Sequence, residues 1–285
     1  MAETARGMFV TDLDGTLLRS DRSLAPRDLE ALELLGEEGI ARVIATGRMP
    51  YSFRRLMGGR RLPVDYLILS TGTGIVDYPR DEILLSRGLT PEATAEVCGT
   101  MIDLDLDFFV QDEFPENHRS WYRSTGRDNP DFYHRLSFYH EWATVYRGPE
   151  PGWGRPSQIV AVVPAAAGVR LYDRVAGLLG EDFSVVRTTS PLDGESMWIE
   201  IFPAGVSKAS AASWLASVLG IGHGGTAAVG NDYNDGDLLD WAGSSYVVAN
   251  APDGFSPGST AVAANDECGV AMAVEHWLNR IGAGR

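Results

Sequence analysis

Short apolar runs alternate with segments of helical periodicity in the first third of the chain. A run of consecutive apolar residues is typical of a strand buried on both faces, whereas leucines about three residues apart indicate one face of a helix. The predicted strands cover Met8–Thr11, Ile40–Ala45 and Tyr66–Leu69, and a helix that begins near Pro26 and ends at Gly39 lies between the first two. This alternation predicts βαβ units and a parallel sheet.

The same alternation returns near the carboxyl end. The predicted elements there are a helix over 207–219, a strand over 226–230, a helix through 238–239 and a strand over 245–249. These segments are expected to rejoin the first sheet. We therefore expect residues 1–78 and 197–285 to form one α/β core domain with a Rossmann-like parallel sheet.

The middle of the chain differs in composition. Aromatic residues crowd 111–157, a helix is predicted near 91–101, and strands over 158–163 and 183–187 flank a helix near 168–180. We interpret residues 79–196 as an α/β cap domain inserted into the core.

Composition narrows the class of protein. The 285 residues are 44% hydrophobic and 22% charged, which is ordinary for a globular protein, and the formal net charge of -15 argues against nucleic acid or an anionic membrane as a partner. Two cysteines far apart, Cys98 and Cys268, indicate neither a disulfide framework nor a metal knuckle. We see no signal peptide or membrane span, so the expected location is the cytoplasm.

Two carboxylates stand at the end of the first predicted strand. Asp12 and Asp14 are two residues apart and precede Gly15 and Thr16. The carboxyl ends of strands form the ligand-binding edge of an open α/β sheet. Neighbouring carboxylates repel each other, so the pair requires a bound cation or a shared proton. Among cations, Mg²⁺ fits oxygen ligands best. The alternative is a strand that ends in a solvated, Asp-rich turn.

This pair of carboxylates is suited to phosphoryl transfer. The Asp12 carboxylate would attack phosphorus and form an aspartyl-phosphate, while Asp14 would protonate the leaving alkoxide and later deprotonate water. Nucleophile and phosphate are both anions, so the attack needs a metal ion and nearby cations.

The second predicted strand ends in candidate phosphate ligands. Thr46 and Gly47 offer a hydroxyl and an unhindered backbone N–H, and Arg48 follows them. The alternative is a strand-to-helix turn capped by Thr46, with Arg48 in solvent.

Two further segments carry matching chemistry. Of the 24 basic residues, 23 are arginines, and the one lysine, Lys208, lies at the start of a predicted helix. An ammonium is a compact point charge that a planar guanidinium does not replace at a tight phosphoryl site. The segment 231–235 places side-chain oxygens at another strand end, where they would complete a magnesium shell. The alternatives are an exposed lysine left by chance and a polar turn.

Taken together, the four segments resemble the haloacid dehalogenase-like hydrolase superfamily, and within it the Cof-type branch (subfamily IIB) of sugar phosphatases. The residues that carry the resemblance are Asp12–Thr16, Thr46–Arg48, Lys208 and Gly230–Asp235, with Cys268–Ala271 similar to the closing segment of that branch. The resemblance covers the core, and the middle block is similar to the family cap only in position and size.

The resemblance implies roles for these residues. Asp12 would be the nucleophile and a metal ligand, Asp14 the general acid and base whose carbonyl also binds the metal, and Lys208 would steady nucleophile and phosphate. The implied phosphate ligands are Thr46, Gly47, Arg48, Lys208 and Asn234.

One position departs from the family pattern. Alignment puts Asn231 where the branch has a metal-binding Asp, with Asp232 beside it. Either Asn231 coordinates through its amide oxygen or Asp232 takes over, and we favour Asn231 because Asn234 and Asp235 keep their register. Asp235 would then be a direct or an indirect metal ligand. An amide ligand leaves the site one negative charge short, which predicts weaker magnesium binding.

The expected function is a magnesium-dependent phosphatase for a small phosphorylated metabolite, a sugar phosphate or sugar-acid phosphate, with selectivity supplied by the cap. The cap arginines that favour such a substrate are Arg119, Arg123, Arg127 and Arg135. A phosphomutase of the same fold, which requires an activating bisphosphate, and a non-catalytic phosphometabolite-binding module are the alternatives. The chain is expected to be a monomer or a small homo-oligomer.

Overall fold

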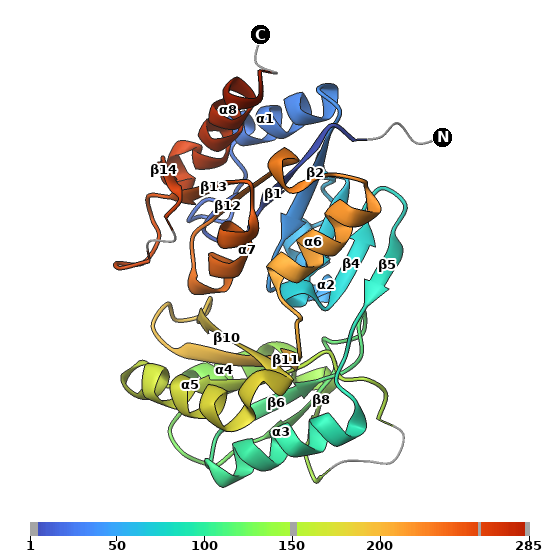
Figure 1. The fold of residues 1–285 in the computed structure, drawn as a ribbon. Helices are drawn as coiled ribbons and strands as arrows, with labels where there is room; N and C mark the ends of the chain where they lie inside the picture. Colours follow the sequence, from blue (N-terminus) through green and yellow to red (C-terminus); the bar gives the residue numbers. More distant parts are fainter. Residues whose placement is uncertain (1–4, 149–152, 256–257, 283–285) are drawn as a thin grey trace. The chain divides into compact units, whose positions relative to one another are not determined.

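The computed structural model describes residues 5–148, 153–255 and 258–282 (Figure 1). Contacts divide the chain into two compact units. Unit 1 contains the described residues of 1–47, 57–85 and 207–285, and unit 2 contains those of 48–56 and 86–206.

Unit 1 is built on a mostly parallel sheet, whose described strands have the order β14-β13-β12-β1-β2-β3-β4-β5. The strands are β1 (Gly7–Thr11), β2 (Ile40–Ala45), β3 (Tyr66–Leu69), β4 (Gly74–Asp77), β5 (Glu82–Ser86), β12 (Thr226–Gly230), β13 (Ser244–Val248) and β14 (Thr260–Val262). From β14 to β3 all pairs are parallel, and β4 turns back antiparallel to β3. The predicted α/β class and parallel core sheet are confirmed.

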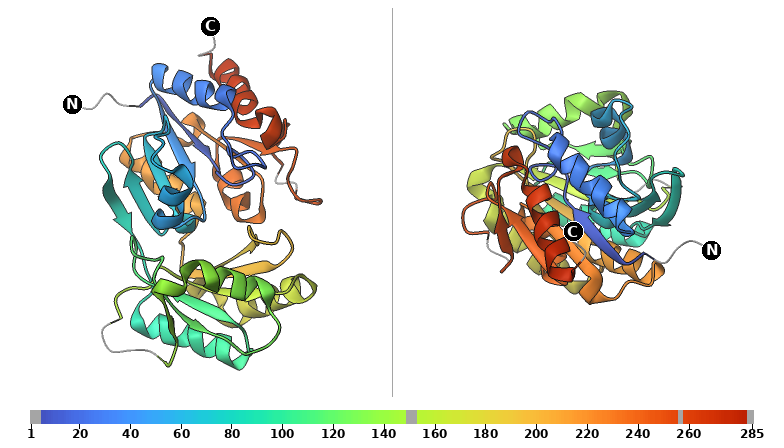
Figure 2. Two further views of the ribbon diagram at one scale, coloured as in Figure 1. Left: turned by 180° about the vertical axis from the view of Figure 1, so that it is seen from behind. Right: turned by 90° about the horizontal axis from the view of Figure 1, so that it is seen from above.

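Helices cover both faces of this sheet (Figures 1 and 2). They are α1 (Pro26–Glu37) and α8 (Gly269–Ile281) on one face, and α6 (Lys208–Val218) and α7 (Gly236–Trp241) on the other. Successive residues of β1 serve the two faces: Met8 and Val10 pack in a cluster with residues of α6 and α7, while the ring of Phe9 lies 5.8 Å from that of Trp277 in α8. Burial on both faces explains why the sequence of β1 is continuously apolar.

Unit 2 contains a second sheet, whose described strands have the order β10-β11-β9-β6-β7-β8. Its strands are β6 (Phe108–Gln111), β7 (Ser120–Arg123), β8 (Ala143–Val145), β9 (Gln158–Val163), β10 (Phe183–Thr189) and β11 (Met197–Pro203), and its helices are α3 (Pro91–Asp103), α4 (Pro130–Tyr139) and α5 (Ala165–Leu179). The short helix α2 (Pro50–Met57) lies almost wholly in the segment assigned to this unit. Helices α3 and α5 pack on one face of the sheet and α4 packs on the other (Figure 2).

The expected domain boundaries differ from this division. The expected boundary at residue 197 places β11 in the core, but β11 pairs antiparallel with β9 and β10 in the second sheet. Residues 79–85 stay with unit 1, where β5 extends the sheet, and segment 48–56 joins unit 2. An apolar run shows that a strand is buried but does not show which sheet it joins, because strand pairing depends on residues distant in the sequence.

Helices long and apolar enough to cross a bilayer do not occur in the described part of the chain.

Candidate active site

The candidate site lies at the carboxyl ends of the parallel strands of unit 1. Asp12 follows β1 directly, and its backbone N–H still donates to the carbonyl of Val229 in β12, 2.9 Å away. Since β1 lies between β2 and β12, the segments after these strands meet at one edge of the sheet. The strand order thus gathers Asp12, Thr46 and the 231–235 loop.

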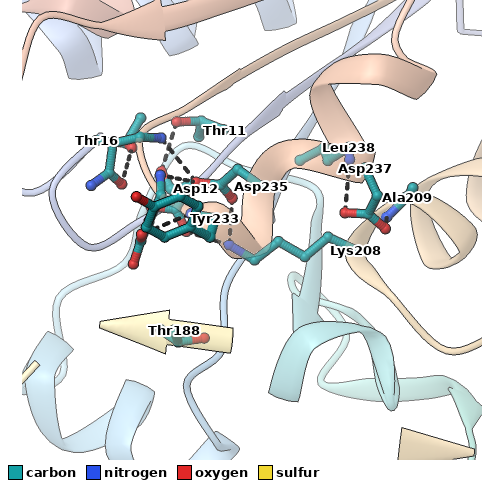
Figure 3. A network of polar contacts seen from close by, with 12 residues as sticks. Thr11, Asp12, Thr16, Thr188, Lys208, Ala209, Tyr233, Asp235, Asp237 and Leu238 are labelled. Carbon is teal, nitrogen blue, oxygen red and sulfur yellow. Dashed lines mark hydrogen bonds and ion pairs between the residues drawn. The ribbon is translucent and has the colours of Figure 1, made fainter. Parts of the chain in front are cut away.

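A buried ammonium links two of the predicted residues. Lys208, the first residue of α6, places its Nζ 2.7 Å from Asp12 Oδ1 and 2.6 Å from Asp235 Oδ1 (Figure 3). The Lys208 side chain is 0% exposed, and Asp12 and Asp235 are also buried. Ser207 caps the helix at this point, since its hydroxyl accepts from the backbone N–H of Ser210. The alternative of an exposed lysine is therefore excluded.

This trio carries two negative charges and one positive charge. Burial first, and repulsion from Asp235 second, raise the pKa of Asp12 to about 7, although Lys208 acts in the opposite direction. Burial disfavours the charged form of Lys208, but attraction to Asp12 and Asp235 outweighs it and holds the pKa of the ammonium above its ordinary value. The excess negative charge makes the site receptive to a cation.

Asp235 organises the loop that follows β12. Its Oδ2 accepts hydrogen bonds from the backbone N–H groups of Asn231 (2.9 Å) and Asp232 (3.1 Å), while Oδ1 is bonded to Lys208. Gly230 permits this closeness, because a Cβ there would lie 2.6 Å from Asp235 Cγ. Both carboxylate oxygens of Asp235 are thus engaged by the chain itself.

The side chain of Asn231 reaches the Asp12 carboxylate and the backbone carbonyl of Asp14. One terminal atom of its amide lies 2.9 Å from the Asp14 carbonyl oxygen, 3.0 Å from Thr16 Oγ1 and 3.3 Å from Asp12 Oδ2. If that atom is the nitrogen, it donates hydrogen bonds to this set of oxygens; if it is the oxygen, it accepts one from Thr16. The first orientation satisfies more groups when no cation is bound.

With the amide oxygen directed inward, the same three positions fit a divalent cation. Adjacent oxygens of an octahedral Mg²⁺ shell lie about 2.9 Å apart, because each is ~2.0–2.1 Å from the ion. The distances from the Asn231 amide to the Asp14 carbonyl (2.9 Å) and to Asp12 Oδ2 (3.3 Å) are close to this value. Such a ligand set would consist of one carboxylate, one carbonyl and one amide. Among the described residues, no group of three or more His, Cys, Asp or Glu side chains is placed to hold a metal ion.

Asp232 makes a different contact. Its Oδ1 accepts from the backbone N–H of Tyr233 at 2.7 Å, as the cap of the short turn 233–235. The geometry brings the Asn231 amide to Asp12 and to the Asp14 carbonyl.

Polar groups surround the glycine after β2. Thr46 is buried, and a Cβ placed on Gly47 would lie 3.5 Å from Thr71 Oγ1 and 3.9 Å from Asn234 Nδ2. Thr71 was not a predicted site residue, yet its buried hydroxyl has no hydrogen-bond partner among the described residues and its φ of 55° is unusual for a β-branched residue. The run of small polar residues after β3 was the signal for it. Arg48 begins the segment assigned to unit 2, and its contact with phosphate stays a prediction.

Two asparagines that sequence reasoning also missed hold the loop after Asp14. Asn250 Nδ2 donates to the carbonyl of Gly15 at 2.8 Å, and its Oδ1 accepts from the backbone N–H of Asn265. Asn265 Nδ2 in turn donates to the carbonyl of Leu18 at 2.9 Å. Their only sequence signal is position: Asn250 follows β13, and Asn265 lies just before α8.

Comparison with known proteins agrees with this geometry. The family model described as haloacid dehalogenase-like hydrolase matches residues 9–274. An HMP-PP phosphatase of Cronobacter sakazakii is 27% identical over 274 residues, which cover 94% of this chain and 94% of that protein.

Solved structures share the fold. The phosphatase BT1666 of Bacteroides thetaiotaomicron has a TM-score of 0.75 at 19% identity and covers 99% of this chain and 97% of its own. The subclass IIB sugar phosphatase BT4131 has a TM-score of 0.71 at 16% identity, with 95% and 98% coverage. At these identities the similarity concerns the fold.

Proposed function

The chain belongs to the haloacid dehalogenase-like hydrolases, and on that premise we propose that it is a magnesium-dependent phosphatase for a small phosphorylated metabolite. The observation that carries the proposal is the buried Lys208 ammonium between Asp12 and Asp235. Lys208 occupies one oxygen of the Asp12 carboxylate, Oδ1. The other oxygen, Oδ2, lies near the Asn231 amide, where a cation and an electrophile would meet. The names of its relatives support a phosphatase.

In the first step, an oxygen of Asp12 attacks phosphorus and the bond to the leaving oxygen breaks, which produces an aspartyl-phosphate. Lys208 holds the Asp12 carboxylate in place and balances charge as negative charge builds on the phosphoryl oxygens. Asp14 gives its proton to the leaving alkoxide. In the second step, Asp14 takes a proton from water, the hydroxide attacks phosphorus, and inorganic phosphate leaves as Asp12 is restored.

We assign the Mg²⁺ ligands to Asp12, the carbonyl of Asp14 and the amide oxygen of Asn231. The ion would neutralise the excess negative charge of the site and polarise a phosphoryl oxygen. Asp235 supports this set indirectly, because its oxygens already hold Lys208 and the backbone of Asn231 and Asp232. Asp232 is left as the cap of the following turn.

We assign the phosphate to the donors around Gly47. Thr46, the Gly47 N–H and Asn234 were expected there, and the Thr71 hydroxyl joins them. Sugar phosphates and HMP-PP are the first compounds to test, since relatives act on them by name. The cytoplasmic location, the oligomeric state and the phosphate contact of Arg48 remain proposals from the sequence.

Hydrolysis of p-nitrophenyl phosphate tests the proposal. We expect steady release of p-nitrophenol with Mg²⁺ and none with excess EDTA. Asp12→Asn should lower kcat by ~10³-fold or more, as expected for loss of a covalent nucleophile. Asp21→Asn, the same substitution at an exposed carboxylate, is the matched control. Absence of turnover in the wild-type protein would contradict the proposal and favour a binding module.

A further inference from the structure

An amide ligand has two chemically different ends, whereas the two oxygens of a carboxylate are equivalent. Asn231 can direct either its oxygen or its nitrogen toward Asp12 and the Asp14 carbonyl. The amide oxygen carries lone pairs that a cation can use, while the NH2 group is a hydrogen-bond donor. The assigned site can therefore bind an ion only while the oxygen is directed inward, and a group that selects this orientation controls the affinity for the ion.

The protein fixes the position of the Asn231 amide without fixing its orientation. The backbone N–H of Asn231 donates to Asp235 Oδ2 at 2.9 Å, which holds the residue in place. Gly15 has a φ of 76° and leaves room for the outer end of the amide, because a Cβ on this glycine would lie 2.8 Å from Asn231 Nδ2. The two ends of an amide are nearly the same in size and shape, so this space accepts either of them.

With the nitrogen inward, the amide faces more acceptors than it has hydrogens. The three oxygens within reach are the Asp14 carbonyl at 2.9 Å, Thr16 Oγ1 at 3.0 Å and Asp12 Oδ2 at 3.3 Å. An NH2 group donates two hydrogen bonds, and the carbonyl and the carboxylate can accept both. The Thr16 hydroxyl is therefore dispensable in this orientation.

With the oxygen inward, the Thr16 hydroxyl becomes essential. Thr16 Oγ1 donates to Asn231 Oδ1 at 3.0 Å, and no other described residue donates to this oxygen. Thr16 is 0% exposed and belongs to the polar network around Asp12 (Figure 3). A carbonyl and an ionised carboxylate cannot donate, so neither the Asp14 carbonyl nor Asp12 can replace the hydroxyl. An amide oxygen has two lone pairs, which allows it to accept from Thr16 and to coordinate an ion at the same time.

We propose that Thr16 is a positioning residue that selects the ion-binding orientation of the Asn231 amide. Its hydroxyl stabilises the oxygen-inward orientation, which needs this donor, more than the nitrogen-inward orientation, which does not. The apparent dissociation constant of an ion equals the intrinsic constant divided by the fraction of molecules in the competent orientation. Loss of the hydroxyl therefore weakens Mg²⁺ binding, although Thr16 is not one of the assigned ligands. This inference rests on the proposed function, which assigns the Asn231 oxygen to the ion.

Calorimetric titration with Mg²⁺, in the absence of substrate, tests the proposal. Thr16→Val keeps the shape of the side chain and removes the hydroxyl, and it should raise the dissociation constant of Mg²⁺ ~5-fold or more, as expected for loss of one hydrogen bond in the bound state. Thr16→Ser keeps the hydroxyl and should retain the affinity of the wild type. In EDTA, Thr16→Val should melt close to the wild type, because the nitrogen-inward orientation does not need the hydroxyl.

The matched control is the same substitution at another buried threonine. The hydroxyl of Thr94 in α3 donates to the carbonyl of Thr90 at 2.8 Å, within unit 2. Thr94→Val should leave the Mg²⁺ affinity unchanged. Wild-type affinity in Thr16→Val, or an equal loss in Thr16→Ser, would overturn the inference.

A double-mutant cycle separates selection of the orientation from a general effect on the loop after β1. In Asn231→Asp the side chain has two equivalent oxygens, so no orientation remains to be selected. Thr16→Val should then change the Mg²⁺ affinity much less in the Asn231→Asp background than in the wild type. Equal losses in the two backgrounds would contradict the proposed role of Thr16.

The wild-type protein provides a second test that needs no folded Thr16 variant. The side-chain ¹H–¹⁵N signals of Asn231 are identified by their absence in Asn231→Asp. In Mg²⁺ these NH2 hydrogens should show nuclear Overhauser contacts to the α hydrogens of Gly15, and in EDTA these contacts should be weaker, because the nitrogen then faces Asp12. Identical contacts in both conditions would show that the amide does not turn and would overturn the inference.

A failure of the phosphatase function is distinguishable from a failure of this inference. A wild-type protein whose Mg²⁺ affinity depends on Thr16 but which hydrolyses no phosphate ester would retain the inference and contradict the catalytic proposal. A protein that hydrolyses p-nitrophenyl phosphate and whose Mg²⁺ affinity is the same in Thr16→Val would do the reverse. A wild-type protein that binds no Mg²⁺ would overturn both.

Discussion

Replacing Asn231 by Asp should change stability in opposite directions with and without Mg²⁺. Without a cation, Asn231→Asp removes an amide that can donate to the Asp14 carbonyl and Asp12, and it places a carboxylate oxygen 3.3 Å from Asp12 Oδ2. Two full charges at that distance repel by ~5 kcal/mol at an effective dielectric constant of 20. Protonation of Asp12 limits this cost, because a protonated carboxyl no longer repels its neighbour. With the pKa of Asp12 at about 7, keeping the group protonated at pH 8 costs ~1.4 kcal/mol.

We therefore expect metal-free Asn231→Asp to be ~1–3 kcal/mol less stable than the wild type at pH 8, which corresponds to a Tm lower by roughly 2–12 °C. With Mg²⁺ the sign reverses. A carboxylate replaces a neutral ligand, so Mg²⁺ affinity should rise at least tenfold, which is ~1.4 kcal/mol of binding free energy. Saturating Mg²⁺ should then close the difference in Tm or invert it.

Thermal melts in EDTA and in Mg²⁺, with calorimetric titration of the ion, measure both effects without any substrate. Asp232→Asn is the control that separates the two assignments, because Asp232 caps the turn at Tyr233 and should leave Mg²⁺ affinity nearly unchanged. The reasoning is refuted if Asn231→Asp melts like the wild type in EDTA and binds Mg²⁺ no more tightly, or if Asp232→Asn is the variant that loses the ion.

Three further outcomes follow from the same contacts. Because burial raises the pKa of Asp12 in the folded protein to about 7, the metal-free protein should lose stability as pH rises from about 4 to 7. Asp12→Asn should lack this loss, so in urea melts the stability of the variant relative to the wild type should increase over that pH range. Lys208→Met should lower the free energy of unfolding by ~3–5 kcal/mol, since it leaves two buried carboxylates without their cation. Lys208→Arg keeps the charge but should still lower kcat at least 100-fold, because a guanidinium cannot replace an ammonium that lies 2.6–2.7 Å from both partners. Near-normal kinetics of the arginine variant would contradict this geometry. Asn250→Ala should lower the free energy of unfolding by ~1–2 kcal/mol, because it removes the hydrogen bond to the Gly15 carbonyl beside Asp14. It should also lower kcat for p-nitrophenyl phosphate more than it raises KM. An unchanged kcat would show that the loop is held without this hydrogen bond.

The sequence by itself determined most of the local elements and the family. Strands 40–45, 66–69, 158–163 and 226–230 lie where apolar runs predicted them, because these strands are almost wholly buried and a buried strand has a continuous apolar sequence. The single lysine among 24 basic residues marked Lys208, since an ammonium and a guanidinium are not interchangeable at a tight site.

The tertiary structure decided what depends on contacts between distant residues. Only strand pairing assigned β11 to the second sheet, and only a side-chain contact across the fold brought Asn250 to the loop after Asp14. Position 231 shows the same limit: the sequence left Asn231 and Asp232 as alternative metal ligands, and only the folded chain shows the Asn231 amide in contact with groups more than 200 residues away. Hydrophobic periodicity is a property of a single segment, whereas partners across a sheet are chosen by the packing of the whole unit.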